Sequence, residues 1–109
     1  MIFKEGVDQL VLTKEGMAIA LAADEVHKEM VDGKEVVITE TNCVKHRVER
    51  SAHYRGDAID IRIWYTDAKK ITISFLATLR ERLGPDYVLI LEHNHIHAHW
   101  APVWHEENA

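Results

Sequence analysis

Histidine occupies every second position from residue 95 to residue 99 of this chain, and the residues between and after them are apolar: Ile96, Ala98 and Trp100. Successive side chains along a β-strand point to opposite faces. The pattern therefore predicts a strand over residues 95–100, with one apolar face and one face made of His95, His97 and His99. Such a strand must lie in a sheet that has a core on one side only.

A second alternating segment covers residues 58–64. One face carries three isoleucines, and the other carries Ala58, Asp60, Arg62 and Trp64. This alternation predicts a strand that holds Asp60 on the face away from the core. Two shorter apolar runs, residues 35–41 and 87–91, predict further strands.

Two amphipathic helices are predicted from apolar residues at helical spacing. The first covers residues 14–31, with Thr13 as N-cap and Asp32-Gly33 at its end. The second begins at a cap formed by Thr66-Asp67 and ends at Gly84-Pro85. Its predicted buried residues are Thr72, Phe75, Leu76, Leu79 and Leu83.

The order of these segments indicates a small α+β domain, with a mostly antiparallel sheet and helices packed on one face. Residues 42–55 are predicted to form a long polar loop. A length of 109 residues suits one domain over residues 1–109, and 47% hydrophobic residues argue against disorder.

Composition also limits the class of function. The net charge of −5 argues against binding to nucleic acid, and the single cysteine, Cys43, excludes an internal disulfide framework. No segment has the pattern of a signal peptide or a membrane span. We therefore expect synthesis in the cytoplasm and no membrane partner, whereas the oligomeric state stays open.

The segment from Ser51 to Asp60 carries the strongest chemical signal. His53 precedes Asp60 by seven residues, and Gly56 between them allows the tight turn that brings the two side chains together. Imidazole and carboxylate are ordinary Zn²⁺ ligands, and a catalytic zinc needs three protein ligands. The third ligand is expected from the histidine strand, with Glu92 nearby as a general base.

Other histidine, tryptophan and arginine side chains have simpler explanations than metal or substrate binding. Isolated histidines such as His27, His46 and His105 are more often structural or exposed, and Trp64, Trp100 and Trp104 favour packing. Three arginines of the predicted loop are either solvated charges or include one that binds a substrate carboxylate through two hydrogen bonds: Arg47, Arg50 and Arg55.

The residues quoted above resemble the zinc D-Ala-D-Ala carboxypeptidase and L-Ala-D-Glu endopeptidase family, whose fold is shared by the Hedgehog signalling domain. The first motif of that family, Ser-x-His-x-x-Gly-x-Ala-x-Asp, is matched from Ser51 to Asp60. Its second motif, His-x-His, is matched by His95-Ile96-His97. The chain looks most similar to small phage-encoded members.

This resemblance implies that His53, Asp60 and His97 bind Zn²⁺. It implies catalytic roles for Glu92, as general base, and His95, at the transition state; an alternative spacing would make His95 the third ligand. Ser51, Arg47 and Arg55 become candidates for substrate binding. His99 matches no position of the family, and either orients a ligand or is exposed.

The resulting expectation is a zinc metallopeptidase that hydrolyses an amide bond in peptidoglycan peptides with a metal-activated water. A phage lysis enzyme of this kind would act on the cell wall. The alternative is a non-catalytic, zinc-bound structural or binding module of the same fold. A third and weaker possibility is metal storage or sensing by the histidine strand.

Overall fold

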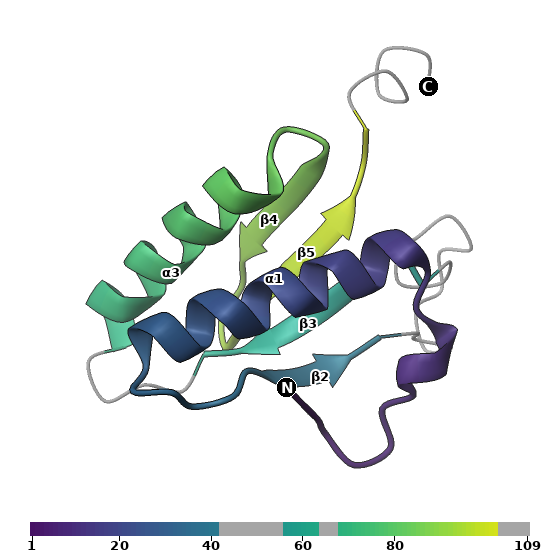
Figure 1. The fold of residues 1–109 in the computed structure, drawn as a ribbon, viewed down its shortest axis with the longest axis horizontal. Coiled ribbons are helices and arrows are strands. Elements are labelled where there is room, and N and C mark those ends of the chain that lie inside the picture. Colours follow the sequence, from purple (N-terminus) through teal and green to yellow (C-terminus); the bar gives the residue numbers. More distant parts are fainter. Residues whose placement is uncertain (42–55, 64–67, 103–109) are drawn as a thin grey trace.

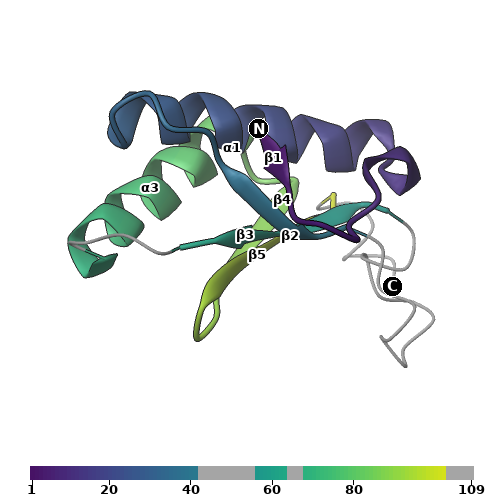
Figure 2. The ribbon, with the colours of Figure 1, turned by 90° about the horizontal axis from the view of Figure 1, so that it is seen from below.

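Five strands form one sheet, and two helices lie side by side across one of its faces (Figures 1 and 2). The structure, a computed structural model, describes residues 1–41, 56–63 and 68–102. The elements in chain order are β1 (Ile2–Phe3), η1 (Gln9–Val11), α1 (Lys14–Met30), β2 (Val37–Glu40), β3 (Ala58–Arg62), α3 (Ala68–Leu83), β4 (Tyr87–Leu91) and β5 (His95–Trp100).

The strands lie in the order β1-β2-β3-β5-β4. Among these described strands, β1 and β2 pair in parallel, and the other three pairs are antiparallel. The predicted α+β class, with a mostly antiparallel sheet and helices on one face, is therefore confirmed. Sequence periodicity missed β1 and the 3-10 turn η1, because two or three residues are too few to show a period.

The two long helices begin and end close to the predicted positions. Thr13 is the N-cap of α1, where its side chain accepts a hydrogen bond from the Gly16 N–H. After α1, Asp32 and Gly33 adopt φ values of 42° and 73°, which a continuing helix does not allow. Helix α3 ends at Leu83, and the cap predicted at Thr66-Asp67 lies outside the described residues.

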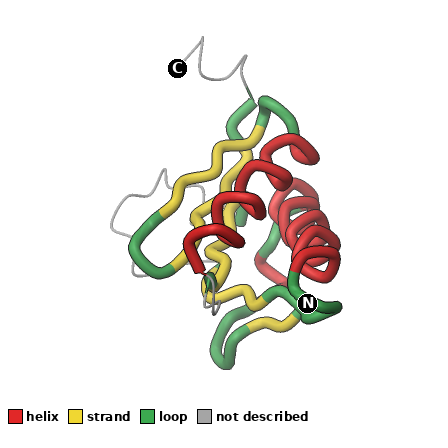
Figure 3. The backbone as a smooth tube through the Cα atoms, turned by 90° about the vertical axis from the view of Figure 1, so that its left-hand side faces the viewer, coloured by secondary structure: helices red, strands yellow, loops and turns green. Residues whose placement is uncertain are grey.

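The core lies between the helices and the sheet, which form the two layers of backbone seen in Figure 3. Side chains from both alternating strands point into it and are fully buried: Ile59, Ile61, Ile96 and Ala98. Helix α1 adds Ile19 and Ala23, and α3 adds Phe75 and Leu79. Since side chains alternate along a strand, the polar residues of β3 and β5 lie on the face that neither helix covers.

Some predicted bounds were too wide. Strand β2 covers residues 37–40 within the predicted 35–41, and β3 ends at Arg62 instead of residue 64. The predicted loop at residues 42–55 lies outside the described ranges, and so do Trp64 and Trp104. No helix within the described ranges is long and apolar enough to cross a membrane.

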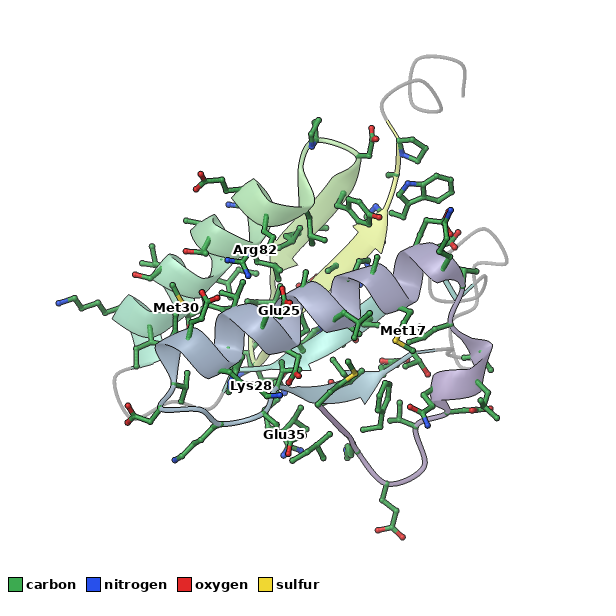
Figure 4. All side chains as sticks on the ribbon, in the orientation of Figure 1. Met17, Glu25, Lys28, Met30, Glu35 and Arg82 are labelled. Atoms are coloured by element: carbon green, nitrogen blue, oxygen red, sulfur yellow. The ribbon has the colours of Figure 1, made fainter. Side chains whose placement is uncertain are left out.

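An ionic contact links the two helices at the surface. Arg82 on α3 lies 3.4 Å from Glu25 and 3.5 Å from Glu29 of α1, and Figure 4 shows the first of these pairs. All three side chains are at least one-third exposed, so solvent screens the attraction. Burial of the apolar helix faces, and not these pairs, holds the helices on the sheet.

Candidate functional site

Asp60 of β3 and His97 of β5 are neighbours across the sheet. They are direct partners in the antiparallel pairing of these two strands, and both point away from the core. The Nδ1 atom of His97 lies 3.2 Å from Oδ1 of Asp60. The side chains are only 19% and 10% exposed, so an imidazole and a carboxylate meet here with little water around them.

The spacing of these two atoms suits a shared zinc ion. Two ligand atoms at opposite ends of a tetrahedron edge lie about 3.3 Å apart when each is about 2.0 Å from the metal. The observed Nδ1 to Oδ1 distance of 3.2 Å agrees with that geometry. Two of the three predicted metal ligands are therefore brought together by the pairing of β3 with β5.

His95 approaches the same carboxylate from the next position on that face of β5. Its Nε2 atom lies 3.6 Å from Oδ2 of Asp60, and its Nδ1 atom is hydrogen-bonded to Oδ1 of Asn94 at 2.8 Å. The direct strand partner of His95 is Arg62 and not Asp60. The geometry therefore brings both candidate histidines to Asp60, with His97 the nearer.

The third histidine of the strand contacts His97 and completes a chain of polar groups. The Nδ1 atom of His99 lies 2.8 Å from Nε2 of His97. The four side chains of this cluster, His95, His97, His99 and Asp60, occupy one continuous stretch of the uncovered sheet face.

Four of the predicted site residues lie outside the described part of the chain. These are the third proposed ligand, His53, and the three substrate-binding candidates, Ser51, Arg47 and Arg55. Among the residues that are described, no three or more histidine, cysteine, aspartate or glutamate side chains form a group that could hold a metal. Of the three proposed ligands, Asp60 and His97 lie within the described ranges.

The start of β3 is fixed by close backbone contacts with α1. Gly56 has a φ of 80°, and a Cβ atom on Gly16 of α1 would lie only 2.2 Å from the Gly56 carbonyl oxygen. The N–H of Thr13 donates to that same oxygen at 3.0 Å. The missing Cβ atom of Gly16 thus lets the first turn of α1 pack against the Gly56 backbone, and a Cβ atom on Gly56 itself would lie 2.1 Å from the Val11 carbonyl oxygen.

Asp57 is a buried residue of this region that sequence reasoning missed. Its carboxylate accepts a hydrogen bond of 2.6 Å from the hydroxyl of Thr13, and its carbonyl oxygen accepts one of 3.0 Å from the Trp100 N–H. Asp57 therefore connects the start of α1 with the end of β5. The only sequence signal was its place inside the glycine motif next to a strand.

Glu92 lies in the turn between β4 and β5 and is exposed. Its backbone N–H donates to the His95 carbonyl oxygen at 2.9 Å. His27, by contrast, is 6% exposed, and its Nδ1 atom is hydrogen-bonded to the Lys34 carbonyl oxygen at 2.7 Å. Of the two roles expected for His27, structural or exposed, its burial and this hydrogen bond support the structural one.

A charged pocket adjoins Asp60 on the uncovered face. Sequence reasoning assigned no role to most of its residues, although the alternation in β3 placed Arg62 on the same face as Asp60. The pocket is lined by Lys4, Thr39, Glu40, Asp60, Arg62, Asn94 and His95. It therefore presents both signs of charge next to the proposed ligands.

Comparison with known families identifies the fold. A sequence model of the Hedgehog amino-terminal signalling domain matches residues 3–99, which is most of the chain. The match includes every helix and nearly every residue of the sheet described above. No curated protein sequence matches the chain.

This match corrects the predicted function. The Hedgehog amino-terminal domain is a non-catalytic signalling ligand, so the predicted membership in a phage or bacterial peptidase family is wrong, and so is the predicted zinc peptidase activity. Zinc binding is a known property of the matched family, in agreement with the predicted cofactor. Because a signalling ligand hydrolyses nothing, we propose no catalytic role for Glu92 or His95.

The predicted partner and location are corrected in the same way. Hedgehog signalling domains bind receptors and not peptidoglycan peptides, and they are secreted, extracellular ligands. The expected endolysin that waits in the cytoplasm and then acts on the cell wall is therefore wrong. The physical reason for the error is that a metal motif specifies ligands for an ion but no reaction.

Proposed function

The chain belongs to the Hedgehog amino-terminal signalling domain family, and from this premise we propose that it is a non-catalytic, zinc-bound binding module. Its partner would be a protein receptor, as for other domains of the family. Residues 1–109 would act as one such domain.

One observation carries the proposal: Nδ1 of His97 and Oδ1 of Asp60 face each other at 3.2 Å on the uncovered face of the sheet. Both atoms are good zinc donors, and their separation is that of neighbouring ligands in a tetrahedral site. Among the described elements, α1 and α3 lie on the other face of the sheet, so neither of these helices blocks the approach of a partner to this face.

We assign the three protein ligands to His53, Asp60 and His97. The choice of His97 over His95 rests on two features of the sheet. His97 is the direct strand partner of Asp60, and its nitrogen is nearer to the carboxylate, at 3.2 Å compared with 3.6 Å for His95. His95 and the charged pocket beside it would then contribute to the surface that a partner contacts.

The zinc content of the purified chain tests this assignment. We expect one zinc per chain by elemental analysis after dialysis against a weak chelator. The single variants His53→Ala, Asp60→Ala and His97→Ala should each lose the metal, because two remaining ligands hold zinc poorly. His95→Ala should keep it.

His93→Ala provides a matched control, since His93 lies in the exposed turn immediately before β5. It should bind zinc as the parent chain does. Full retention of zinc by both Asp60→Ala and His97→Ala would refute the proposed site. Loss of zinc from His95→Ala with retention in His97→Ala would move the third ligand to His95.

A further inference from the structure

We propose that His99 is a positioning residue that selects the tautomer of His97 able to bind zinc. The inference rests on the proposed function, since it concerns the same metal site. Its structural basis is separate, however, because it comes from a contact on the side of the His97 ring that faces away from Asp60.

The two nitrogens of His97 have different neighbours. Nδ1 faces Oδ1 of Asp60 at 3.2 Å, whereas Nε2 lies 2.8 Å from Nδ1 of His99. The planes of the two rings are inclined by 51° with their centres 5.0 Å apart, so the rings are not stacked. The contact between them is a hydrogen bond between one nitrogen of each ring.

A neutral imidazole has one N–H and one nitrogen with a free lone pair, and only the latter can bind a metal. If Nδ1 of His97 binds zinc, the ring proton must be on Nε2. The nearest described acceptor for that proton is Nδ1 of His99, which must then carry its own proton on Nε2. His99 thus stabilises the metal-binding tautomer of His97 by accepting its hydrogen bond.

The arrangement also predicts the metal-free state. Without a metal, the carboxylate of Asp60 accepts a hydrogen bond from Nδ1–H of His97, because a carboxylate has no proton to give. Nε2 of His97 then accepts from Nδ1–H of His99. For two neutral rings, zinc binding would therefore move one proton from Nδ1 to Nε2 in each ring without net release from the pair.

Nitrogen NMR of histidine-labelled protein at pH 8 reads these tautomers directly. In the metal-free chain, we expect both His97 and His99 to carry the proton on Nδ1. After addition of one equivalent of Zn²⁺, we expect both to carry it on Nε2. The metal-free measurement is independent of zinc affinity and of any effect on folding.

Competition with a chromophoric chelator gives the energetic test. His99→Ala should weaken zinc binding by about 10- to 100-fold, as is usual when a hydrogen-bond partner of a metal-bound histidine is lost. His99→Gln should recover much of the affinity, because its side-chain oxygen can accept the Nε2–H. His93→Ala should bind zinc with unchanged affinity.

The outcomes separate the two proposals. Zinc affinity within twofold of the parent in His99→Ala would overturn the role of His99 and leave the zinc site intact. An Nδ1 proton on His97 in the zinc-loaded chain would mean that this nitrogen does not bind zinc, and would overturn both the role of His99 and the assignment of Nδ1 of His97 as a ligand atom. A chain that takes up no zinc would overturn the proposed function, and with it any role of His99 in metal binding.

Discussion

At the scale of single residues, two glycines far apart in the sequence determine where β3 begins. A Cβ atom on Gly16 would lie 2.2 Å from the Gly56 carbonyl oxygen, and one on Gly56 would lie 2.1 Å from the Val11 carbonyl oxygen. Neither backbone oxygen can move without shifting its whole segment. The proposed ligands His53 and Asp60 flank this contact in the sequence.

Gly16→Ala should therefore destabilise the chain. Alanine in place of glycine normally stabilises a helix interior by about 1 kcal/mol. Here the added methyl group forces α1 away from Gly56, so we expect a net loss of about 1–3 kcal/mol in the free energy of unfolding. Urea unfolding monitored by circular dichroism measures it.

Leu21→Ala is a suitable control for that experiment, because Leu21 lies on the same helix and is 55% exposed. Its stability should stay within about 0.5 kcal/mol of the parent. An increase in stability for Gly16→Ala would contradict the close approach of α1 to Gly56.

The strand faces that carry the metal candidates were easier to predict than the contacts that support them. Alternation alone placed Asp60 and His97 on one face, because period two follows directly from strand geometry. The contacts of Asp57 with Thr13 and Trp100 could not be predicted in this way. They join residues more than forty positions apart and depend on how α1 docks, which no local pattern encodes.

At the scale of secondary-structure elements, Thr13 connects α1 to β3. Its hydroxyl accepts from the Gly16 N–H at 3.2 Å and donates to Asp57 at 2.6 Å. Thr13→Ala removes the helix cap and also one hydrogen bond of the buried Asp57 carboxylate. We expect a loss of about 1–2 kcal/mol in the free energy of unfolding.

Thr13→Ser separates the loss of the hydroxyl from the loss of the methyl group, because serine keeps the hydroxyl that caps the helix and lacks only the methyl group. Its stability should lie much closer to the parent than to Thr13→Ala in the same urea titration. Equal losses for the two variants would show that the methyl group of Thr13, and not its hydroxyl, holds α1 in place.

Asp24 connects α1 with the residues that directly precede β1 and β2, Met1 and Val36. Its carboxylate lies 2.9 Å from the Met1 ammonium and 3.1 Å from Nζ of Lys28, and it accepts from the Val36 N–H at 3.2 Å. Burial raises the pKa of Asp24, but these hydrogen bonds and charges outweigh burial and hold the pKa below its ordinary value of 3.8.

A lowered pKa in the folded state predicts a specific dependence on pH. The stabilisation by ionised Asp24 is fully present above the unfolded pKa and is lost as the pH falls through the lower folded pKa. The difference in unfolding free energy between the parent and Asp24→Asn should therefore be largest near pH 6 and shrink below about pH 4. A difference that stays constant down to pH 3 would contradict this.

The presence of the two long helices, and the face on which each strand residue lies, could be predicted because the spacing of apolar residues repeats along each long element. The helix spanning residues 14–30 and the strand at residues 95–100 were predicted nearly to their bounds. Strand β1 was not, since it has two residues and is defined only by its parallel pairing with β2.

At the scale of the whole molecule, the same fold and metal motif serve two kinds of protein. The motif from Ser51 to Asp60 and the His-x-His pair describe how an ion is held. They do not specify whether water or a partner protein occupies the remaining position. That is why reasoning from these residues predicted the fold correctly and named zinc, a metal that the matched family is known to bind, but also predicted a hydrolase, whereas the family match over residues 3–99 identifies a signalling domain.

Zinc should stabilise the whole domain if the proposed site is correct. Its ligands come from β3, from β5 and from the segment before β3, so the metal joins strands that separate on unfolding. A ligand that binds only the folded state raises the free energy of unfolding by about 2.7 kcal/mol at 100 times its dissociation constant. Thermal unfolding of the chelated chain, with and without added Zn²⁺, should show this increase.

The variants decide whether this stabilisation arises at Asp60 and His97. His97→Ala and Asp60→Asn should unfold at the same temperature with and without Zn²⁺, whereas His93→Ala should respond as the parent does. An equal zinc response in all four chains would mean that the ion binds elsewhere, for example to exposed histidines. Strand β5 lies between β3 and β4 in the sheet. If His97→Ala lost the zinc response while Asp60→Asn kept it, the metal would be bound on β5 without Asp60.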